Sequence, residues 1–300
     1  MMVKRTREIL LRLFCCMAAA IMVTGCIKDD LSDCGVSYTL TVRAYDHSGV
    51  ELGISEVEAV SLFVFDGSTR FVRKIDTRIG AQVAINDMPL GEDIHIVAWG
   101  NLNYGGQTYS TPNAGELLSD CFVELRPTSR ATAYALSPGD LFRGQITIAA
   151  NDRSGGKVLP IYREVGSLAI TIVNLKTFAG FADNDYSIVV RESYQNIGFN
   201  GHLFGDKVSY LPSGSFMTNN GNEEYRVPAF SMIPEDGGLY IDIYHGSQLI
   251  ATVSRDNSGE VIIVEKGKQS NVLIKLSSTG DINVSVSIDN WGNSGGEKEF

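Results

Sequence analysis

The stretch Val36-Ser37-Tyr38-Thr39-Leu40-Thr41-Val42-Arg43-Ala44 sets the pattern that decides the fold. Its even-numbered positions carry Val, Tyr, Leu, Val and Ala, whereas its odd-numbered positions carry Ser, Thr, Thr and Arg. Side chains of a β-strand point alternately to opposite faces, so this period of two indicates a strand with one face in a core and the other in water.

Short segments of the same type follow along the rest of the chain. The further predicted strands are Ala59–Phe65, Phe71–Asp76, Gln82–Ile85, Ile94–Trp99, Cys121–Leu125, Gln145–Ala149, Val158–Arg163, Ser167–Val173, Tyr186–Arg191, Tyr225–Ser231, Leu239–Tyr244, Gln248–Ser254, Glu260–Val264, Ser270–Leu276 and Ile282–Ile288. Turn sequences such as Asp66-Gly67 and Asp256-Asn257-Ser258-Gly259 separate them. One short helix is expected near Ala114–Ser119, after Pro112. Many short strands without alternating helices predict an all-β fold made of β-sandwiches.

These strands are too numerous for a single sandwich. The pattern breaks at Asn151–Gly156, and Pro160 follows the break. We therefore predict an N-terminal domain of residues 26–160 and a C-terminal domain of residues 161–300.

The first 25 residues have the features of an export signal. Four basic residues lie within the first twelve positions, an apolar run follows from Leu13 to Val23, and Val23-Thr24-Gly25-Cys26 ends it. A basic start, a short apolar core and small residues before the cut are typical of secretory signals. The last four residues resemble the bacterial lipobox, whose cysteine thiol accepts a diacylglyceryl group. The apolar run is shorter than the roughly 20 residues that a membrane-spanning helix needs. We therefore predict a signal peptide of residues 1–25 and a lipid on Cys26.

The charge of the chain excludes some partners. The 300 residues contain 25 Lys and Arg and 35 Asp and Glu, a net charge of −10. Removing residues 1–25 takes away four basic residues and one acidic residue, which leaves 21 against 34, a net charge of −13. Such an acidic protein is a poor partner for nucleic acid phosphates or for an anionic lipid surface. The lipid, and not charge, is expected to hold the protein to the membrane.

The cysteines point to one candidate disulfide. Of five cysteines, Cys15 and Cys16 leave with the signal and Cys26 takes the lipid, so Cys34 and Cys121 remain. Two thiols left in an oxidising compartment are expected to pair. The alternative, two buried free thiols, stays open. Closing this long loop would stabilise the fold by at most roughly 4–5 kcal/mol.

The sequence offers little support for an enzyme or a metal site. The four histidines, His47, His95, His202 and His245, are scattered. Asp183-Asn184-Asp185 resembles the start of a calcium loop but lacks the Gly and Glu that such a loop needs downstream. We expect no catalytic residue, no cofactor and no metal.

Aromatic residues leave a second function open. Trp99 and Trp291, with Tyr104 and Tyr109, are of the type that stacks on sugar rings, although aromatics in β-sandwiches are more often core residues. A surface glycan-binding lipoprotein is therefore an alternative function. A secreted hydrolase with a β-sandwich accessory domain is another, but it would need paired carboxylates or a nucleophile and base in one pocket.

Four stretches resemble a known family. They are Cys26-Ile27-Lys28-Asp29-Asp30-Leu31-Ser32-Asp33-Cys34, Ile94-His95-Ile96-Val97-Ala98-Trp99-Gly100-Asn101, Gly139-Asp140-Leu141-Phe142-Arg143-Gly144 and Arg163-Glu164-Val165-Gly166-Ser167-Leu168-Ala169-Ile170. In content and order they resemble the FimB-type fimbrial anchor lipoproteins, which include the minor-fimbrium anchor subunits. Gly166-Ser167 departs from the larger strand residues expected there.

The resemblance implies a fold and a function. It implies two tandem transthyretin-like, Greek-key β-sandwich domains at the base of a type V pilus on the outer membrane. The partner would be a fimbrillin subunit, and the anchor would limit the length of the fimbrium. Lys28-Asp29-Asp30 resembles the acidic export signal that sends such lipoproteins to the cell surface. A lipid-anchored subunit must keep its N-terminal strand, so Val36–Ala44 is expected to stay in place and the strands Ser270–Leu276 and Ile282–Ile288 to meet the partner.

Overall fold

The structure is a computed structural model that describes residues 36–88, 91–128, 131–152, 155–219, 221–235 and 237–291. The predicted signal peptide, Cys26 and Cys34 lie outside these residues. The strands are β1 (Val36–Tyr45), β2 (Val60–Phe65), β3 (Phe71–Thr77), β4 (Gln82–Met88), β5 (Ile94–Gly100), β6 (Gln107–Tyr109), β7 (Phe122–Leu125), β8 (Pro127–Thr128), β9 (Ala131–Ala135), β10 (Phe142–Ile148), β11 (Lys157–Arg163), β12 (Gly166–Val173), β13 (Tyr186–Gly198), β14 (Leu203–Tyr210), β15 (Ser215–Asn219), β16 (Asn222–Met232), β17 (Tyr240–His245), β18 (Gln248–Val253), β19 (Lys268–Leu276) and β20 (Ile282–Asn290). Two short helices, η2 (Leu118–Asp120) and α2 (Leu175–Ala179), complete the elements. The predicted all-β class is confirmed. No helix within the described ranges is long and apolar enough to cross a membrane.

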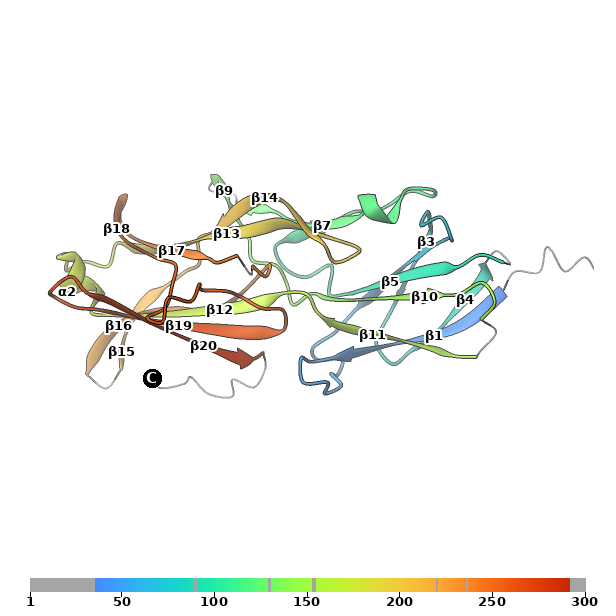
Figure 1. The fold of residues 1–300 in the computed structure, drawn as a ribbon, viewed down its shortest axis with the longest axis horizontal. Coiled ribbons are helices and arrows are strands. Elements are labelled where there is room, and N and C mark those ends of the chain that lie inside the picture. Colours follow the sequence, from blue (N-terminus) through green and yellow to red (C-terminus); the bar gives the residue numbers. More distant parts are fainter. Residues whose placement is uncertain are drawn as a thin grey trace, which may run out of the picture.

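The first half is built on one seven-stranded sheet in the order β3-β2-β5-β10-β11-β1-β4. In this sheet β1 lies between β11, to which it runs parallel, and β4, to which it runs antiparallel. Tyr38, Leu40, Val42 and Ala44 are buried, as the alternation predicts, and they pack against residues of β2, β5 and β10 from the same sheet. The sheet therefore folds over on itself, and β1 and β11 lie in a different layer from β5 and β10 (Figure 1).

Strands β2 and β5 are buried on both faces. Leu62 and Ile96 point into the core shared with β1, whereas Phe63 and Trp99 belong to a second core that continues into the other half of the molecule. All six residues of β2 are buried. A strand covered on both sides has an almost continuous apolar sequence, which accounts for the run from Val60 to Phe65.

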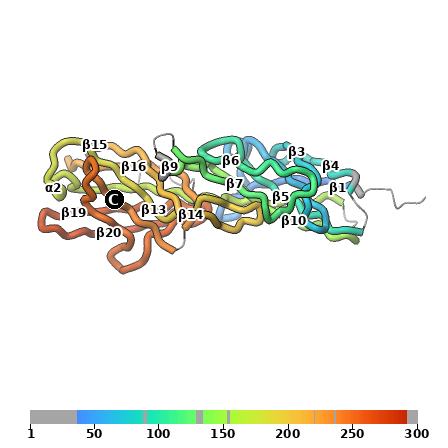
Figure 2. Tube along the Cα trace, turned by 90° about the horizontal axis from the view of Figure 1, so that it is seen from above, coloured from blue at the N-terminus to red at the C-terminus, as the bar shows by residue number. Residues whose placement is uncertain are grey.

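The second half has two facing sheets. One is five-stranded, in the order β15-β16-β12-β19-β20. The other is eight-stranded: six strands follow the order β18-β17-β13-β14-β9-β8, and off this path β7 pairs with β13 and β6 pairs with β7. Strand β13 has 13 residues and pairs first with β17 and then, at Asn196–Gly198, with β7. The molecule is elongated, with β1 in one half and α2 at the far end of the other, and the β13–β14 hairpin reaches across the junction (Figures 1 and 2). Phe199, next to this hairpin turn, packs against Phe63 at a ring centroid distance of 4.6 Å, so the two halves share a core.

Two sequence predictions about local structure are wrong. Glu260–Val264 is not a strand, because only isolated bridges from Val261 to Arg255 and from Val264 to Glu235 occur there. The helix expected at Ala114–Ser119 is reduced to the three-residue η2. Gly115 has a positive φ of 89°, and the Asn113 backbone N–H bonds the Glu116 carboxylate, so this segment forms a turn.

The sequence also missed several elements. These are the strands β6, β8, β9, β14 and β15 and the helix α2.

Pro160, which helped to place the predicted domain boundary, lies inside β11 opposite Arg43 of β1. The chain passes from the seven-stranded to the five-stranded sheet between Arg163 and Gly166.

Candidate functional site

The histidines lie at separate places in the described structure. His95 bonds Thr147 at 2.9 Å, and His245 bonds the Asp183 carboxylate at 2.7 Å. His47 lies in the cleft described below, and His202 lies at the β13–β14 turn. In the part of the chain that the structure describes, no three His, Cys, Asp or Glu residues gather as metal ligands.

The aromatic residues considered for sugar stacking do not form one exposed surface. Trp99 is fully buried in the shared core, against Phe199. The Trp291 ring packs against Arg163, with 5.2 Å between its centroid and the guanidinium carbon. Tyr104 is 46% exposed. The core interpretation therefore holds for Trp99, and the glycan-binding alternative loses one of its two tryptophans.

Cys121, directly before β7, is buried and is bonded to no other cysteine of the described residues. Its Sγ donates a hydrogen bond to the Leu117 carbonyl at 3.4 Å. Burial raises the pKa of this thiol to about 11, and the nearby carboxylates of Glu116 and Asp120 act in the same direction. Its predicted partner, Cys34, lies outside the described residues, so the Cys34–Cys121 disulfide stays a prediction.

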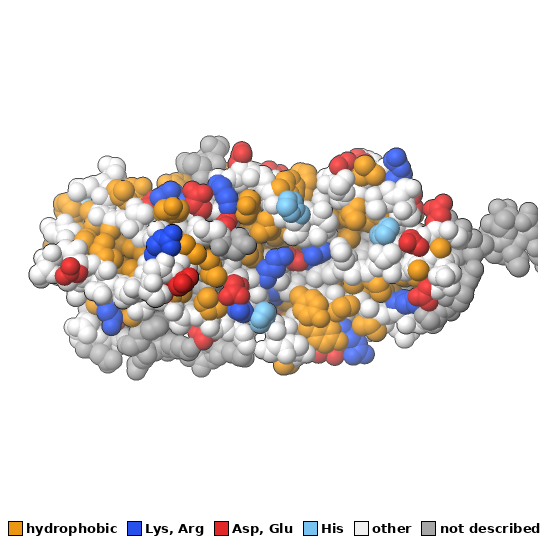
Figure 3. Space-filling model, in the orientation of Figure 1, with side chains coloured by type: hydrophobic (Ala, Val, Ile, Leu, Met, Phe, Trp, Pro, Cys, Tyr) orange, Lys and Arg blue, Asp and Glu red, His pale blue; other side chains and the backbone are white. Residues whose placement is uncertain are grey.

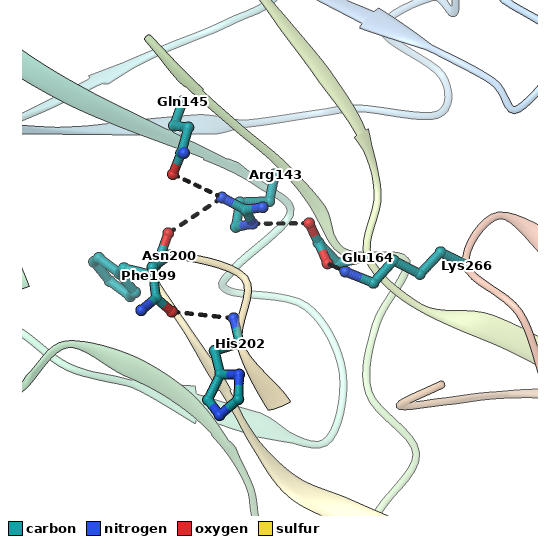
Figure 4. Close-up of polar contacts among 7 residues, drawn as sticks. All are labelled: Arg143, Gln145, Glu164, Phe199, Asn200, His202 and Lys266. Carbon is teal, nitrogen blue, oxygen red and sulfur yellow. Dashed lines mark hydrogen bonds and ion pairs between the residues drawn. The ribbon is translucent and has the colours of Figure 1, made fainter. Parts of the chain in front are cut away.

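A charged cluster joins the two halves. Glu164, in the short connection between β11 and β12, is 5% exposed and accepts a hydrogen bond from Arg143 Nε at 2.8 Å. Lys266, from the loop before β19, approaches the same carboxylate from the other side (Figure 4). Arg143 also donates to the Phe199 carbonyl at 3.3 Å. The Glu164 carboxylate thus pairs with a cation from each half, Arg143 from the first and Lys266 from the second.

The hairpin turn beside this cluster leaves room for the arginine. Gly201 has a φ of 83°, and a Cβ at this position would lie 2.3 Å from Arg143 Nη2. A side chain at this position would adopt a backbone conformation that favours glycine and would displace the Arg143 guanidinium.

A second contact fastens the end of β20 to the first half. The Arg163 guanidinium lies between the rings of Phe142 and Trp291, at 5.0 and 5.2 Å, and Arg163 Nε donates to Asp140 at 2.9 Å. The Asn290 amide donates to Ser48 Oγ at 2.8 Å. Cation–π stacking of the desolvated Arg163 adds to these hydrogen bonds. Both the Arg163 contacts and the Asn290–Ser48 bond therefore hold the end of β20 to the first half.

An open cleft of about 450 Å³ lies at this junction, lined by His47, Arg143, Gln145, Tyr162, Arg163, Glu164 and Lys266 among others. Blue and red side chains gather at the middle of the face shown in Figure 3. The cluster cations lie against Glu164 and Asp140, so the cleft is a salt-bridged joint and not a free cationic surface.

The edge of the five-stranded sheet offers a different type of site. Strand β20 is the last in the order of this sheet and pairs with β19 over nine residues. Val284 exchanges hydrogen bonds on its outer side, at 2.8 and 3.0 Å, with Asn257. Peptide groups of a strand alternate in direction, so those of Val286 and Ile288 also point outward, away from β19.

The side chains of this edge are apolar on one face. Val284 is buried in the core, and Ile282 and Ile288 on the same face are 37% and 39% exposed. An edge strand with outward peptide groups and exposed apolar side chains is a template for another strand. In the described part of the chain, no strand pairs with this outer edge.

Sequence reasoning placed β20 at the partner surface but did not single out the residues around it. Arg143 and Glu164 lie within stretches used for the family resemblance, and Asn257 lies within a predicted turn. Their roles depend on contacts between distant segments, for which the sequence gives no periodic pattern.

Comparison with known proteins places this geometry in context. The family model for fimbrillin-A associated anchor proteins Mfa1 and Mfa2 matches residues 31–294. The major fimbrium anchoring subunit FimB of Porphyromonas gingivalis is 28% identical over 286 residues, which cover 90% of each chain. The fimbrial anchor protein Mfa2 from Porphyromonas gingivalis has a similar fold, with a TM-score of 0.62 at 12% identity over 86% of this chain and 98% of that one. A putative adhesin from Bacteroides ovatus gives a TM-score of 0.63 at 11% identity over 89% and 98% of the two chains.

Proposed function

This chain belongs to the family of fimbrillin-A associated anchor proteins, and we propose that it fastens the base of a fimbrium to the outer membrane. The match of the family model over residues 31–294 is the observation that carries the proposal. The family consists of fimbrial anchor proteins, and we propose that this chain acts through binding and not through catalysis.

The lipid supplies the membrane end of the proposed anchor. Cys26 follows a lipobox-like Val23-Thr24-Gly25, and Lys28-Asp29-Asp30 resembles an export signal to the cell surface. Because stable anchoring needs more than one acyl chain, we propose that Cys26 carries several.

A tethered protein that carries a fimbrium needs a firm link between its two ends. We propose that it consists of two tandem Greek-key sandwiches of the transthyretin-like type. The predicted division into residues 26–160 and 161–300 is part of this proposal. The bonded joint around Glu164 supports a rigid link between the lipid end and the partner end.

We propose that the fimbrillin subunit meets the outer edge of β20. Strand β1 is paired on both sides, by β11 and β4, so its edges are not free for a partner. The outward peptide groups of Val286 and Ile288 and the exposed Ile288 side chain suit a strand of another chain. A subunit that fills this edge at the membrane would end growth at the base, which is the proposed basis of length control.

The experiment that tests the anchor function compares cells with wild-type protein and with Cys26→Ala. Intact mass and surface labelling report the lipid and its location, and electron microscopy reports the fimbriae. We expect the variant to release fimbriae into the medium or to make them longer. Lipidated wild-type protein with unaffected fimbriae in the variant would refute the proposal, and glycan binding would be tested next.

The contact surface has its own test. Ile288→Lys places a charge on the exposed apolar face of the edge, a substitution that blocks strand addition. Ser285→Lys is the matched control, because Ser285 is exposed on the opposite face of the same strand. We expect loss of fimbrial attachment with Ile288→Lys alone; equal attachment in both variants would exclude this edge.

A further inference from the structure

The outer edge of β20 is interrupted at one position by a turn. Asp256, Asn257, Ser258 and Gly259 form this turn, in which Asp256 Oδ1 accepts the backbone N–H groups of Ser258 and Glu260 at 2.9 and 3.0 Å. The Ser258 hydroxyl bonds the same carboxylate oxygen at 2.6 Å. The Asp256 carboxylate thus fixes the turn and holds Asn257 against the strand.

Asn257 makes the two hydrogen bonds that one residue of a neighbouring strand would make with β20. Its side-chain Oδ1 accepts the Val284 N–H at 2.8 Å, and its backbone N–H donates to the Val284 carbonyl at 3.0 Å. These are the two bonds that a paired strand would make with an outward-facing residue. The peptide groups of Val284 are therefore unavailable to a partner, whereas those of Val286 and Ile288 have no strand beside them within the described residues.

The far end of the edge is also bounded. The Asn290 side chain bonds Ser48, and Trp291 lies against Arg163, so β20 ends against the first half. Between the Asn257 cap and this junction, the outward peptide groups of Val286 and Ile288 face no other strand of the described residues. A short extended segment fits this length.

We propose that Asn257 is a register stop, which confines an added partner strand to the outward peptide groups of Val286 and Ile288 and excludes it from Ile282 and Val284. This inference rests on the proposed function and names the part of the edge that the fimbrial subunit uses. The partner segment is extended and alternates apolar residues, because Val286 and Ile288 present their side chains toward the core face, where Ile288 is 39% exposed.

The chemistry of the site favours a separate chain over the end of this one. Residues 292–300 read Gly-Asn-Ser-Gly-Gly-Glu-Lys-Glu-Phe. They are rich in Gly and charged residues, which are poor strand formers, and they lack alternating apolar side chains. A fimbrial subunit segment with such alternation is therefore the proposed occupant.

Photo-crosslinking in fimbriated cells tests the stop. A photo-reactive phenylalanine analogue is placed at Ile288 or at Ile282 of the full-length protein, and adducts are identified by mass spectrometry. We expect an adduct with a fimbrial subunit from position 288 and a much weaker one from position 282. In Asn257→Ala the adduct at 282 should rise about fivefold, the effect of losing about one net hydrogen bond.

Two further variants separate the stop from a loss of folding. Asn257→Asp keeps an oxygen acceptor and should retain the wild-type pattern. Ser258→Ala loosens the same turn without contacting Val284, and it should also leave position 282 weakly crosslinked.

Several results would overturn the inference. These are equal adducts at 282 and 288 in the wild type, an unchanged pattern in folded Asn257→Ala, or an intramolecular adduct from 288 to residues 292–300. If fimbriae stay attached in Ile288→Lys cells and 288 gives no adduct, the edge is not the contact, although the anchor function can stand. If removing the whole protein leaves the fimbriae unchanged, the anchor function itself fails.

Discussion

Replacing Glu164 with Gln should weaken the joint between the two halves. The Glu164 side chain is 6% exposed and faces two cations, Arg143 at 14% exposure and Lys266 at 42%. Removing one partner of a fully buried ion pair costs about 3–5 kcal/mol, because a charge stays buried without compensation. Lys266 can turn its ammonium to water, which leaves Arg143 as the main uncompensated group. We therefore expect a loss of about 2–3 kcal/mol in the free energy of unfolding.

Urea unfolding of the mature protein measures this loss. The two tryptophans report on different places, since Trp99 is in the shared core and Trp291 is at the joint. The midpoint should fall in Glu164→Gln with little change in the urea dependence. Glu192→Gln is the matched control, because its contact with Arg191 is 3.8 Å and exposed, so it should change stability by less than about 0.5 kcal/mol. A loss below about 1 kcal/mol in Glu164→Gln would refute the reasoning, since a surface pair gives as much.

Three other outcomes are expected. Phe199→Ala should cost about 3–5 kcal/mol by emptying the shared core, and calorimetry should then show two separate transitions; one unchanged transition would argue against a shared core. Asp242 is buried, which by itself raises its pKa, but the hydrogen bond from Arg191 and its charge outweigh burial and lower it. The ionised Asp242 carboxylate therefore stabilises the fold above its ordinary pKa of about 4, and this stabilisation is lost as pH falls through the lower folded pKa. Asp242→Asn should reduce the loss of stability between neutral and acidic pH. An unchanged dependence of stability on acidic pH would contradict this assignment. Unreduced mature protein should lack free thiol at Cys34 and Cys121, and alkylation of either after unfolding without reductant would exclude the disulfide.

Local sequence patterns determined most of the strands. The alternation from Val36 to Ala44 became β1, with its even-numbered side chains from Tyr38 onward in the core. The continuous apolar run Val60–Phe65 became a strand buried on both faces. Such patterns can be read along the chain because the side-chain direction of a strand repeats every two residues. The lipobox around Cys26 is likewise a short contiguous motif, and it carries the prediction of the lipid anchor.

Only the tertiary structure decided which segments meet. The Glu164–Lys266 ion pair joins positions 102 residues apart, and the Asn257–Val284 contact joins positions 27 apart. Glu260–Val264 has the composition of a strand but forms only isolated bridges. A strand exists through hydrogen bonds to neighbours that the sequence does not name, and a salt-bridged joint exists through the packing of separate segments. The sequence by itself therefore determined what each segment can form, and the packing of the sheets decided which strands are paired on both sides and where the outer edge of β20 begins and ends.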